Sequence, residues 1–144
     1  MARPDCVFCE IVAGRSPASV VYRDGLVIAF MDLGAVTPGH LLVVPTEHYP
    51  LLGDLPDDLA AHVFLVAKRL AAAIRASGLR CDGINLLVAD GEAAFQEVLH
   101  HHVHVFPRWP GDGFSIDATA WSEPKPSRAE LDATAAAIRS TLDA

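Results

Sequence analysis

Three features are missing from this sequence: a long apolar run, a secretory leader and an excess of basic residues. No apolar stretch approaches the roughly 20 residues that a membrane-spanning helix needs. The N-terminal segment lacks the apolar core of a signal peptide. With 11 Lys and Arg against 18 Asp and Glu, the formal net charge is −7, which argues against a nucleic-acid backbone as the main partner. We therefore expect a cytoplasmic protein that binds no membrane and no nucleic acid.

Cysteine is scarce as well, with three residues in 144. An odd number in a chain without a leader does not suggest a disulfide framework. Cys6 and Cys9 stand at positions i and i+3, where two thiolates can converge on one metal ion. The alternatives for this pair are plain packing of two reduced cysteines and a redox Cys-x-x-Cys, which is disfavoured because no βαβ pattern surrounds it. Cys81 has no partner in this pattern, and we interpret it as a small hydrophobe.

The length of 144 residues, 51% of them apolar, predicts one domain with a substantial core. Strand-forming runs between turn signals predict five strands, at residues 20–22, 26–30, 40–45, 83–88 and 100–106. Apolar residues at helical spacing predict a helix that opens with an N-cap at Asp54-Leu-Pro-Asp57 and ends near Gly78. A capping box, Ser127-x-x-Glu130, begins a second helix, whose apolar stripe is Leu131, Ile138 and Leu142. Few strands are separated by crossover helices, so we expect an antiparallel α+β sheet.

Four of the seven histidines fall within five positions, at His100, His101, His102 and His104. Because side chains alternate along a strand, the even-numbered three would share one face, and His101 would face the other side, toward solvent or a second subunit. Three imidazoles in a row are costly to bury without partners, and imidazole suits nucleophilic attack, proton transfer and metal ligation. An accidental exposed metal-binding row is the plain alternative, which the apolar flanks and the following Pro107 disfavour.

The pattern Gln96-x-Val98-x-His100-x-His102-x-His104-x-x-Pro107-Arg108 resembles the signature of the histidine-triad (HIT) family. Residues 6–14, 17–22, 29–32 and 37–45 are similar to the N-terminal half of the family in order and spacing, so the resemblance covers nearly all of residues 6–108. It implies a single HIT domain over residues 1–144, in which residues 109–144 form a tail and the last helix. The implied α+β fold has an antiparallel sheet of about five strands and two main helices. The family is typically a homodimer whose sheets join across the subunits.

The resemblance implies an enzyme that works through the central histidine. His102 would attack the α-phosphorus of a nucleotide and form a nucleotidyl-histidine intermediate, which water resolves. His104 would hold the imidazole tautomer and the phosphate, and His40 would support the triad from a neighbouring strand. We expect a hydrolase or transferase that acts on purine nucleoside phosphoramidates or related nucleotide derivatives. A dinucleoside polyphosphate hydrolase is an alternative that the triad does not separate from it.

Nucleotide-binding positions of the family also carry over to this chain. The residues implied are Val7, Phe8, Ile11, Phe30, Asp32, Leu33, Gln96 and Glu97. The first four match an apolar slot for the base, and Asp32 matches a carboxylate that accepts hydrogen bonds from both ribose hydroxyls. Without the resemblance, the apolar residues would be interpreted as core packing and Asp32 as the start of a turn.

A subset of the family holds a zinc ion with residues from three segments. In this chain the matching residues are Cys6, Cys9, His48 and His100, a Cys2His2 set that suits structural zinc. His100 would then orient the catalytic site and would not be a free acid or base. A weaker alternative is a metal-sensor module that uses the histidine cluster alone.

Three positions near the implied phosphate site depart from the family pattern. Ala89 stands where Asn is common, Phe95 where Gly is usual, and Glu97 where a hydroxyl residue commonly donates to the phosphate. The bulk of Phe95 would hinder close backbone approach, and the Glu97 carboxylate would repel a phosphate. Losing one oxyanion donor costs about 2.7–4 kcal/mol of transition-state stabilisation. These departures keep open a weakly active or inactive zinc-stabilised nucleotide-binding or interaction protein.

Overall fold

The computed structural model describes residues 3–116 and 124–142. The chain divides into two compact units, Met1–Asp112 and Gly113–Ala144. Five strands of the first unit form one antiparallel sheet in the order β1-β2-β3-β5-β4: β1 (Val20–Arg23), β2 (Val27–Met31), β3 (Leu41–Pro45), β4 (Gly83–Leu87) and β5 (Val103–Arg108). The helices of this unit are α1 (Val7–Val12) and α2 (Asp57–Ala76), with 3-10 turns at Leu52–Asp54 and Glu92–Ala94. The predicted antiparallel α+β sheet is confirmed, whereas the single domain over residues 1–144 stays a prediction.

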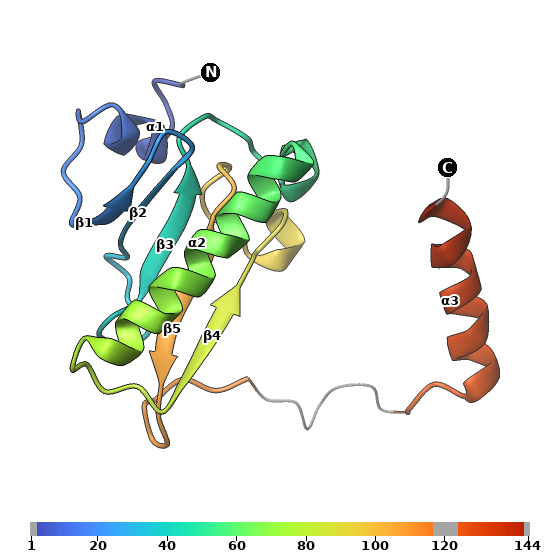
Figure 1. Cartoon of the computed structure of the whole chain (residues 1–144). Helices are drawn as coiled ribbons and strands as arrows, with labels where there is room; N and C mark the ends of the chain where they lie inside the picture. The colour runs from blue at the N-terminus through green and yellow to red at the C-terminus, as the bar shows by residue number, and fades with distance from the viewer. Residues whose placement is uncertain (1–2, 117–123, 143–144) are drawn as a thin grey trace. The chain divides into compact units, whose positions relative to one another are not determined.

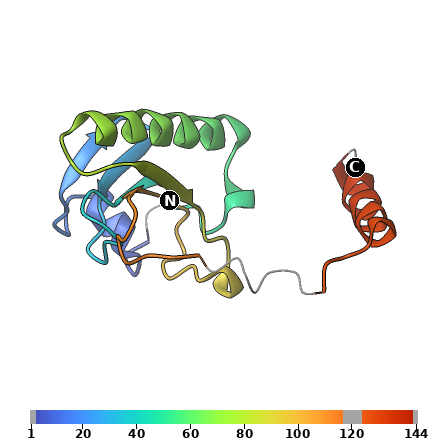
Figure 2. The same cartoon turned by 90° about the horizontal axis from the view of Figure 1, so that it is seen from below.

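The long helix α2 lies across one face of the sheet, and the short helix α1 lies on the opposite face (Figures 1 and 2). The buried face of α2 consists of apolar residues spaced three or four positions apart: Leu59, Val63, Val66, Leu70 and Ile74. They share one core with side chains of β2, β3 and β5, among them Val27, Val43 and Val105. The second core, under α1, includes Phe8, Cys9, Phe30 and Leu42. Because both faces of β2 and β3 are covered, these strands are apolar almost throughout.

The β1–β2 turn is held to α2 through Asp24. Its Oδ1 accepts hydrogen bonds from the backbone N–H groups of Leu26 and Val27, both at 2.8 Å. Its Oδ2 accepts from the Tyr22 hydroxyl and lies 2.7 Å from Nε2 of His62, which belongs to α2. These hydrogen bonds outweigh the opposing effect of burial and hold the pKa of the Asp24 carboxyl well below its usual range. One charged side chain therefore fixes the hairpin turn and its contact with the helix.

Two predicted element boundaries were wrong. The predicted N-cap at Asp54 belongs to a separate 3-10 turn, where Asp54 Oδ2 accepts from Leu51 N at 2.9 Å. The helix begins three residues later, after Pro56, whose side chain has no hydrogen-bonding group. Its acidic first turn and its end before Gly78, which has a φ of +84°, agree with the prediction.

The last strand begins at Val103, not at His100, and it continues through Pro107. The residues before it leave the ladder, since His101 N–H donates to the Tyr49 carbonyl in a loop, at 2.6 Å. Pro107 fits in the strand because the pairing of β5 with β3 ends at Val105. The carbonyl of Pro107 accepts from Thr37 Oγ1 at 2.7 Å, beyond the residues of β3 that pair with β5. The nitrogen of Pro107 faces the same side as its carbonyl, so the missing N–H breaks no hydrogen bond of the ladder.

In the second unit, α3 (Arg128–Leu142) begins with the predicted capping box. Ser127 N–H donates to Glu130 Oε2 at 2.7 Å, and Glu130 N–H donates to Ser127 Oγ at 3.2 Å. The predicted apolar stripe of this helix is exposed, and none of its described residues is buried. Among the described helices, none combines the length and apolar character that crossing a membrane requires.

Replacing Asp24 by Asn should lower the stability of the fold and change its response to acid. Because the folded pKa of Asp24 lies below the usual value of 3.8, its contribution is complete above that pH and is lost as the pH falls below it. We expect Asp24→Asn to lower the free energy of unfolding by about 1–2 kcal/mol at pH 7, with the difference from wild type shrinking below pH 4. Urea unfolding between pH 3 and pH 7 measures both. A constant difference across this range would contradict the assignment.

Candidate active site and metal centre

Four candidate metal ligands converge beside α1. Cys6 lies just before α1, Cys9 lies within it, His48 follows β3, and His100 precedes β5. The ligand atoms of all four lie within 4.8 Å of one another. The shorter separations are 3.4 Å from Cys6 Sγ to His100 Nδ1, 3.4 Å from Cys9 Sγ to His48 Nδ1, and 3.7 Å from Cys9 Sγ to His100 Nδ1. Tetrahedral zinc with its usual bond lengths places sulfur and nitrogen ligands about 3.5 Å apart, so the spacing fits.

The protonation states of this cluster also fit a metal. His100 Nε2–H donates to the Pro45 carbonyl at 2.8 Å, which leaves the lone pair on Nδ1, facing the cysteines. Burial lowers the pKa of His100 to about 4, so its ring is neutral at physiological pH, as a ligand requires. Burial raises the pKa of the Cys6 thiol, so a bound cation would have to displace its proton. Cys81, by contrast, lies apart from the cluster and donates to the Gly83 carbonyl.

The central histidine is held by the backbone of the first. His102 Nδ1–H donates to the His100 carbonyl at 2.7 Å, because a carbonyl can only accept. The lone pair of a neutral His102 ring therefore resides on Nε2. Burial lowers the pKa of His102 and keeps this ring neutral near pH 7. The ring packs edge-on against Phe8, at 5.1 Å between centroids, and against His104, at 4.9 Å.

His104 belongs to a second polar group. Its Nδ1 lies 2.9 Å from Nε2 of His40, which directly precedes β3. Asp32 Oδ2 lies 3.3 Å from His40 Nε2 and 3.7 Å from His104 Nδ1. Burial and the neighbouring histidines lower the pKa of His104 to about 4, and burial lowers the pKa of His40. Both rings are therefore neutral at physiological pH, beside a carboxylate.

The implied nucleotide-binding residues do not all meet at the histidines. Phe8 and Phe30 do: both are buried, their ring centroids lie 5.4 Å apart, and Phe8 contacts His102. Val7 is half exposed and lines a different cavity, described below. Leu33 is fully exposed. Ile11 is partly buried and packs against the core under α1.

The side-chain amide of Gln96 stabilises the loop in which this residue lies. Its Oε1 accepts from Gly91 N at 2.8 Å, and its Nε2 donates to the carbonyls of Pro50 and Val98 at 2.8 and 3.1 Å. Glu97 next to it is exposed. It lines a cavity of about 400 Å³ together with Arg3, Asp5, Cys6, Val7, His48, Pro50, Val98 and Leu99. Glu97 therefore shares a cavity with two of the candidate metal ligands, Cys6 and His48.

Phe95 occupies a backbone conformation that explains why Gly suits its position. Its φ of +65° and ψ of 33° lie in the left-handed region, where a Phe side chain costs energy. The side chain is 88% exposed, so packing does not offset this strain within the described part of the chain. The carboxylate of Asp90 cannot donate a hydrogen bond to a phosphate. Its Oδ1 instead accepts from Leu52 N at 2.7 Å.

Sequence reasoning missed several groups that shape the site. The Pro45 carbonyl and the Val36 N–H hold His100 and His40, but backbone groups carry no signature in a sequence. Of the two environments expected for His101, solvent or a second subunit, the first is wrong, since its side chain is 3% exposed in this chain alone. His101 is buried because residues 100–102 do not pair in the sheet. The alternation of side chains along a strand could not predict this.

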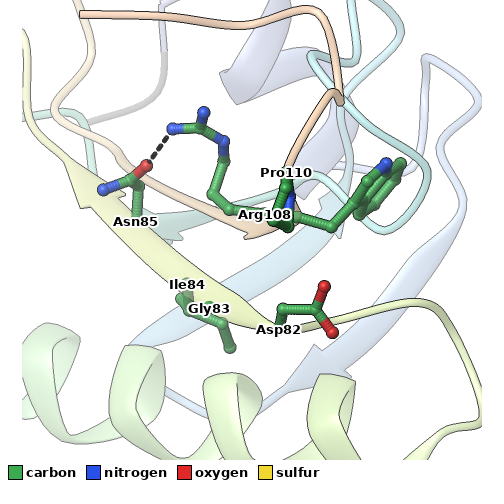
Figure 3. Close-up of a pocket in the computed structure, with 7 residues that line it drawn as sticks. Asp82, Gly83, Ile84, Asn85, Arg108 and Pro110 are labelled. Atoms are coloured by element: carbon green, nitrogen blue, oxygen red, sulfur yellow. Dashed lines mark hydrogen bonds between the residues drawn. The ribbon is translucent and has the colours of Figure 1, made fainter.

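A second cavity, of about 440 Å³, lies at the far end of β5 from the histidines (Figure 3). It is lined by Asp82, Gly83, Ile84, Asn85, Arg108, Trp109 and Pro110. Arg108 Nη1 donates to Asn85 Oδ1 at 2.6 Å, and Arg108 Nε donates to Asp112 Oδ2 at 2.6 Å. Because the Asp112 carboxylate neutralises the Arg108 guanidinium, this cavity is a poorer candidate for the catalytic site.

A family model described as HIT domain matches residues 13–111. A HIT-like protein of Mycobacterium tuberculosis (strain ATCC 25618 / H37Rv) is 39% identical over 137 residues, which cover 95% of this chain and 92% of that protein. The crystal structure of a HIT family protein from Bacillus anthracis str. 'Ames Ancestor' has a TM-score of 0.87 at 35% identity, covering 96% of this chain and 98% of the other.

Two further similarities bear on chemistry. A zinc-bound histidine triad family protein from Mycobacterium smegmatis has a TM-score of 0.74 at 45% identity, covering 78% of this chain and 81% of the other. An adenylylsulfatase of Arabidopsis thaliana is 38% identical over 105 residues, which cover 72% of this chain and 52% of that protein, so this chain spans about half its length. The match to the family model over most of the chain and these relatives lead to one conclusion: the chain belongs to the HIT domain family.

Proposed function

We propose that this protein is a nucleotide hydrolase or transferase that acts at the α-phosphate of purine nucleoside phosphoramidates or related derivatives, with His102 as nucleophile. The observation that carries the proposal is the hydrogen bond from His102 Nδ1–H to the His100 carbonyl. It leaves the lone pair on Nε2 in a ring that burial keeps neutral. A neutral, oriented imidazole is the form that attacks phosphorus. The relative from Arabidopsis thaliana is an adenylylsulfatase, which supports chemistry at an adenylyl group.

The reaction takes place in two displacements. The lone pair of His102 Nε2 forms a bond to the α-phosphorus while the bond from phosphorus to the leaving nitrogen breaks, and the leaving amine keeps that electron pair and takes up a proton. Water then attacks phosphorus and loses a proton, and His102 Nε2 recovers its pair. His104, whose ring centroid lies 4.9 Å from that of His102, is the polar group placed to donate toward the reacting phosphate.

The nucleoside part would lie between the aromatic pair and Asp32. Phe8 and Phe30 are buried apolar rings, of which Phe8 contacts His102, and Asp32 follows β2 with a partly exposed carboxylate. Asp32 Oδ1 already accepts from Gly34 N at 2.8 Å, which orients the carboxylate. A carboxylate held in this way accepts hydrogen bonds from two adjacent hydroxyl groups.

A nucleotide-binding protein with weak catalysis is the second candidate. The observation that favours it is in the loop before the histidines, where the side-chain amide of Gln96 is already paired and the Glu97 carboxylate is near enough to act on His102 through its charge. Without further donors, the developing charge on the phosphate would be poorly stabilised. The two candidates share the binding site and differ in turnover.

The four ligands beside α1 would hold a structural zinc ion. The ion would join the N-terminal segment to the segments after β3 and before β5, in addition to the apolar core under α1. We also propose a homodimer formed through β4, which lies at one end of the strand order with Leu86 and Leu87 partly exposed. Sedimentation at the mass of a single 15.4 kDa chain at micromolar concentration would contradict the dimer.

Replacing His102 should abolish covalent labelling. Incubation of wild type with adenosine 5′-phosphoramidate and rapid quenching should give an adenylylated peptide containing His102 by mass spectrometry. In His102→Ala the adduct should be absent and kcat/KM should fall by at least about 10³-fold, because the nucleophile is lost. His62→Ala, a change at a histidine on α2 outside the site, is the matched control and should keep both. Wild type that neither forms an adduct nor turns over phosphoramidates and dinucleoside polyphosphates, yet binds AMP, would favour the second candidate.

The zinc assignment predicts one tightly held zinc ion per chain. Mass spectrometric metal analysis should find it in wild type and in Cys81→Ser, the matched control, but not in Cys6→Ser/Cys9→Ser. The double variant should also melt at a lower temperature, because a metal that binds only the folded chain stabilises it. Full zinc occupancy in the double variant would overturn the site and would favour a site built from the other histidines.

A further inference from the structure

His40 has only one place for its hydrogen. Val36 N–H donates to His40 Nδ1 at 3.0 Å, so this nitrogen carries the lone pair. Burial lowers the pKa of His40, and the neutral ring therefore carries its single N–H at Nε2. The ring is 3% exposed and packs against Phe106, at 4.9 Å between centroids, which keeps it from turning over. The tautomer of His40 is thus fixed by a backbone group of the loop before β3.

This single hydrogen faces two acceptors. His104 Nδ1 lies 2.9 Å from His40 Nε2, and Asp32 Oδ2 lies 3.3 Å from it. When the hydrogen points to His104, the Nδ1 of His104 accepts and its own hydrogen must reside on Nε2, on the opposite side of the ring. When the hydrogen points to Asp32, His104 loses the partner that fixes its tautomer. The acceptor that takes the His40 hydrogen therefore decides whether His104 is held as an Nε2–H donor.

A metal ion is the competing explanation for this group. Asp32, His40 and His104 place one carboxylate oxygen and two ring nitrogens within 4.8 Å of one another, as a divalent cation would require. However, a cation at His40 Nε2 would have to displace the hydrogen that the Val36 N–H assigns to this atom, which would leave an anionic ring. The hydrogen-bonded arrangement needs no such deprotonation.

We propose that His40 is a positioning residue that fixes His104 as an Nε2–H donor, and that Asp32 couples this state to binding of the ribose. Ribose hydroxyls that donate to Asp32 weaken it as an acceptor for the His40 hydrogen, which then commits to His104. The site would thus order its donor only when a ribose with free hydroxyls is bound. This inference rests on the proposed function for its ribose site and its kinetic consequence, but the tautomers can be measured without turnover.

The first experiment is NMR of the folded protein labelled with ¹⁵N at its histidine rings. AMP and 2′,3′-dideoxy-AMP serve as probes that cannot react further. We expect an Nε2–H tautomer for His40 throughout. For His104 we expect a mixture of tautomers in the free protein and with the dideoxy probe, and the Nε2–H tautomer with AMP. In Asp32→Asn the two probes should give the same His104 spectrum. A hydrogen on Nδ1 of His40, a hydrogen on Nδ1 of His104 in the AMP complex, an equal response to both probes in wild type, or a second zinc ion per chain would overturn the proposal.

The second experiment separates positioning from binding by steady-state kinetics. Removing both ribose hydroxyls from the phosphoramidate should lower kcat of wild type by about 10-fold, beyond any rise in KM, whereas kcat of Asp32→Asn should be the same for both substrates. His40→Ala should lose kcat with little change in KM, and His40→Gln, whose amide N–H can replace the ring donor, should recover part of it. Equal kcat for both substrates in wild type would overturn the coupling. If wild type shows no turnover at all, the proposed function fails, and the NMR experiment still decides the tautomers.

Discussion

The candidate active site depends on one residue, His100, whose ring nitrogens and carbonyl are all engaged. Its Nδ1 faces the two cysteines, its Nε2–H donates to the Pro45 carbonyl, and its own carbonyl accepts from His102 Nδ1–H. The side chain is completely buried, so none of these partners can be exchanged for water. A shift of His100 would therefore move the ring of His102 and disturb the metal ligands at once. In this fold the candidate metal centre and the proposed nucleophile, His102, are therefore mechanically linked.

Burial gives the histidines their chemical form. The sheet face under α1 is apolar, and it lowers the pKa of each triad member, so the rings stay neutral where isolated histidines would be partly charged. A neutral ring has one N–H and one lone pair, and the partner of one nitrogen decides the role of the other. The His100 carbonyl does this for His102, and the Val36 N–H does it for His40. The row of histidines is thus made unequal by backbone groups.

The phosphate side is the part of the site that departs most from its family. Phe95 adopts a left-handed backbone in spite of its side chain, and this conformation costs energy. The fully paired Gln96 holds this loop, while Glu97 next to it brings a negative charge toward the metal cluster. Phe8 lies beside His102 as the proposed site requires, whereas Val7, Ile11 and Leu33 lie elsewhere.

The sequence alone determined the five strands and the buried stripe of α2, because both depend on side-chain type and spacing. Spacing pointed to Cys6 and Cys9 as candidate metal ligands, and the resemblance to the family added His48 and His100. The sequence did not determine that residues 100–102 leave the ladder, that Asp54 caps a separate turn, or that His101 is buried. Nor did it determine which nitrogen of each histidine bears the hydrogen. Those features depend on where the Pro45 carbonyl and the Val36 N–H come to lie, and every residue carries the same backbone groups. Only the tertiary structure, by bringing distant backbone atoms within hydrogen-bonding distance, decided them.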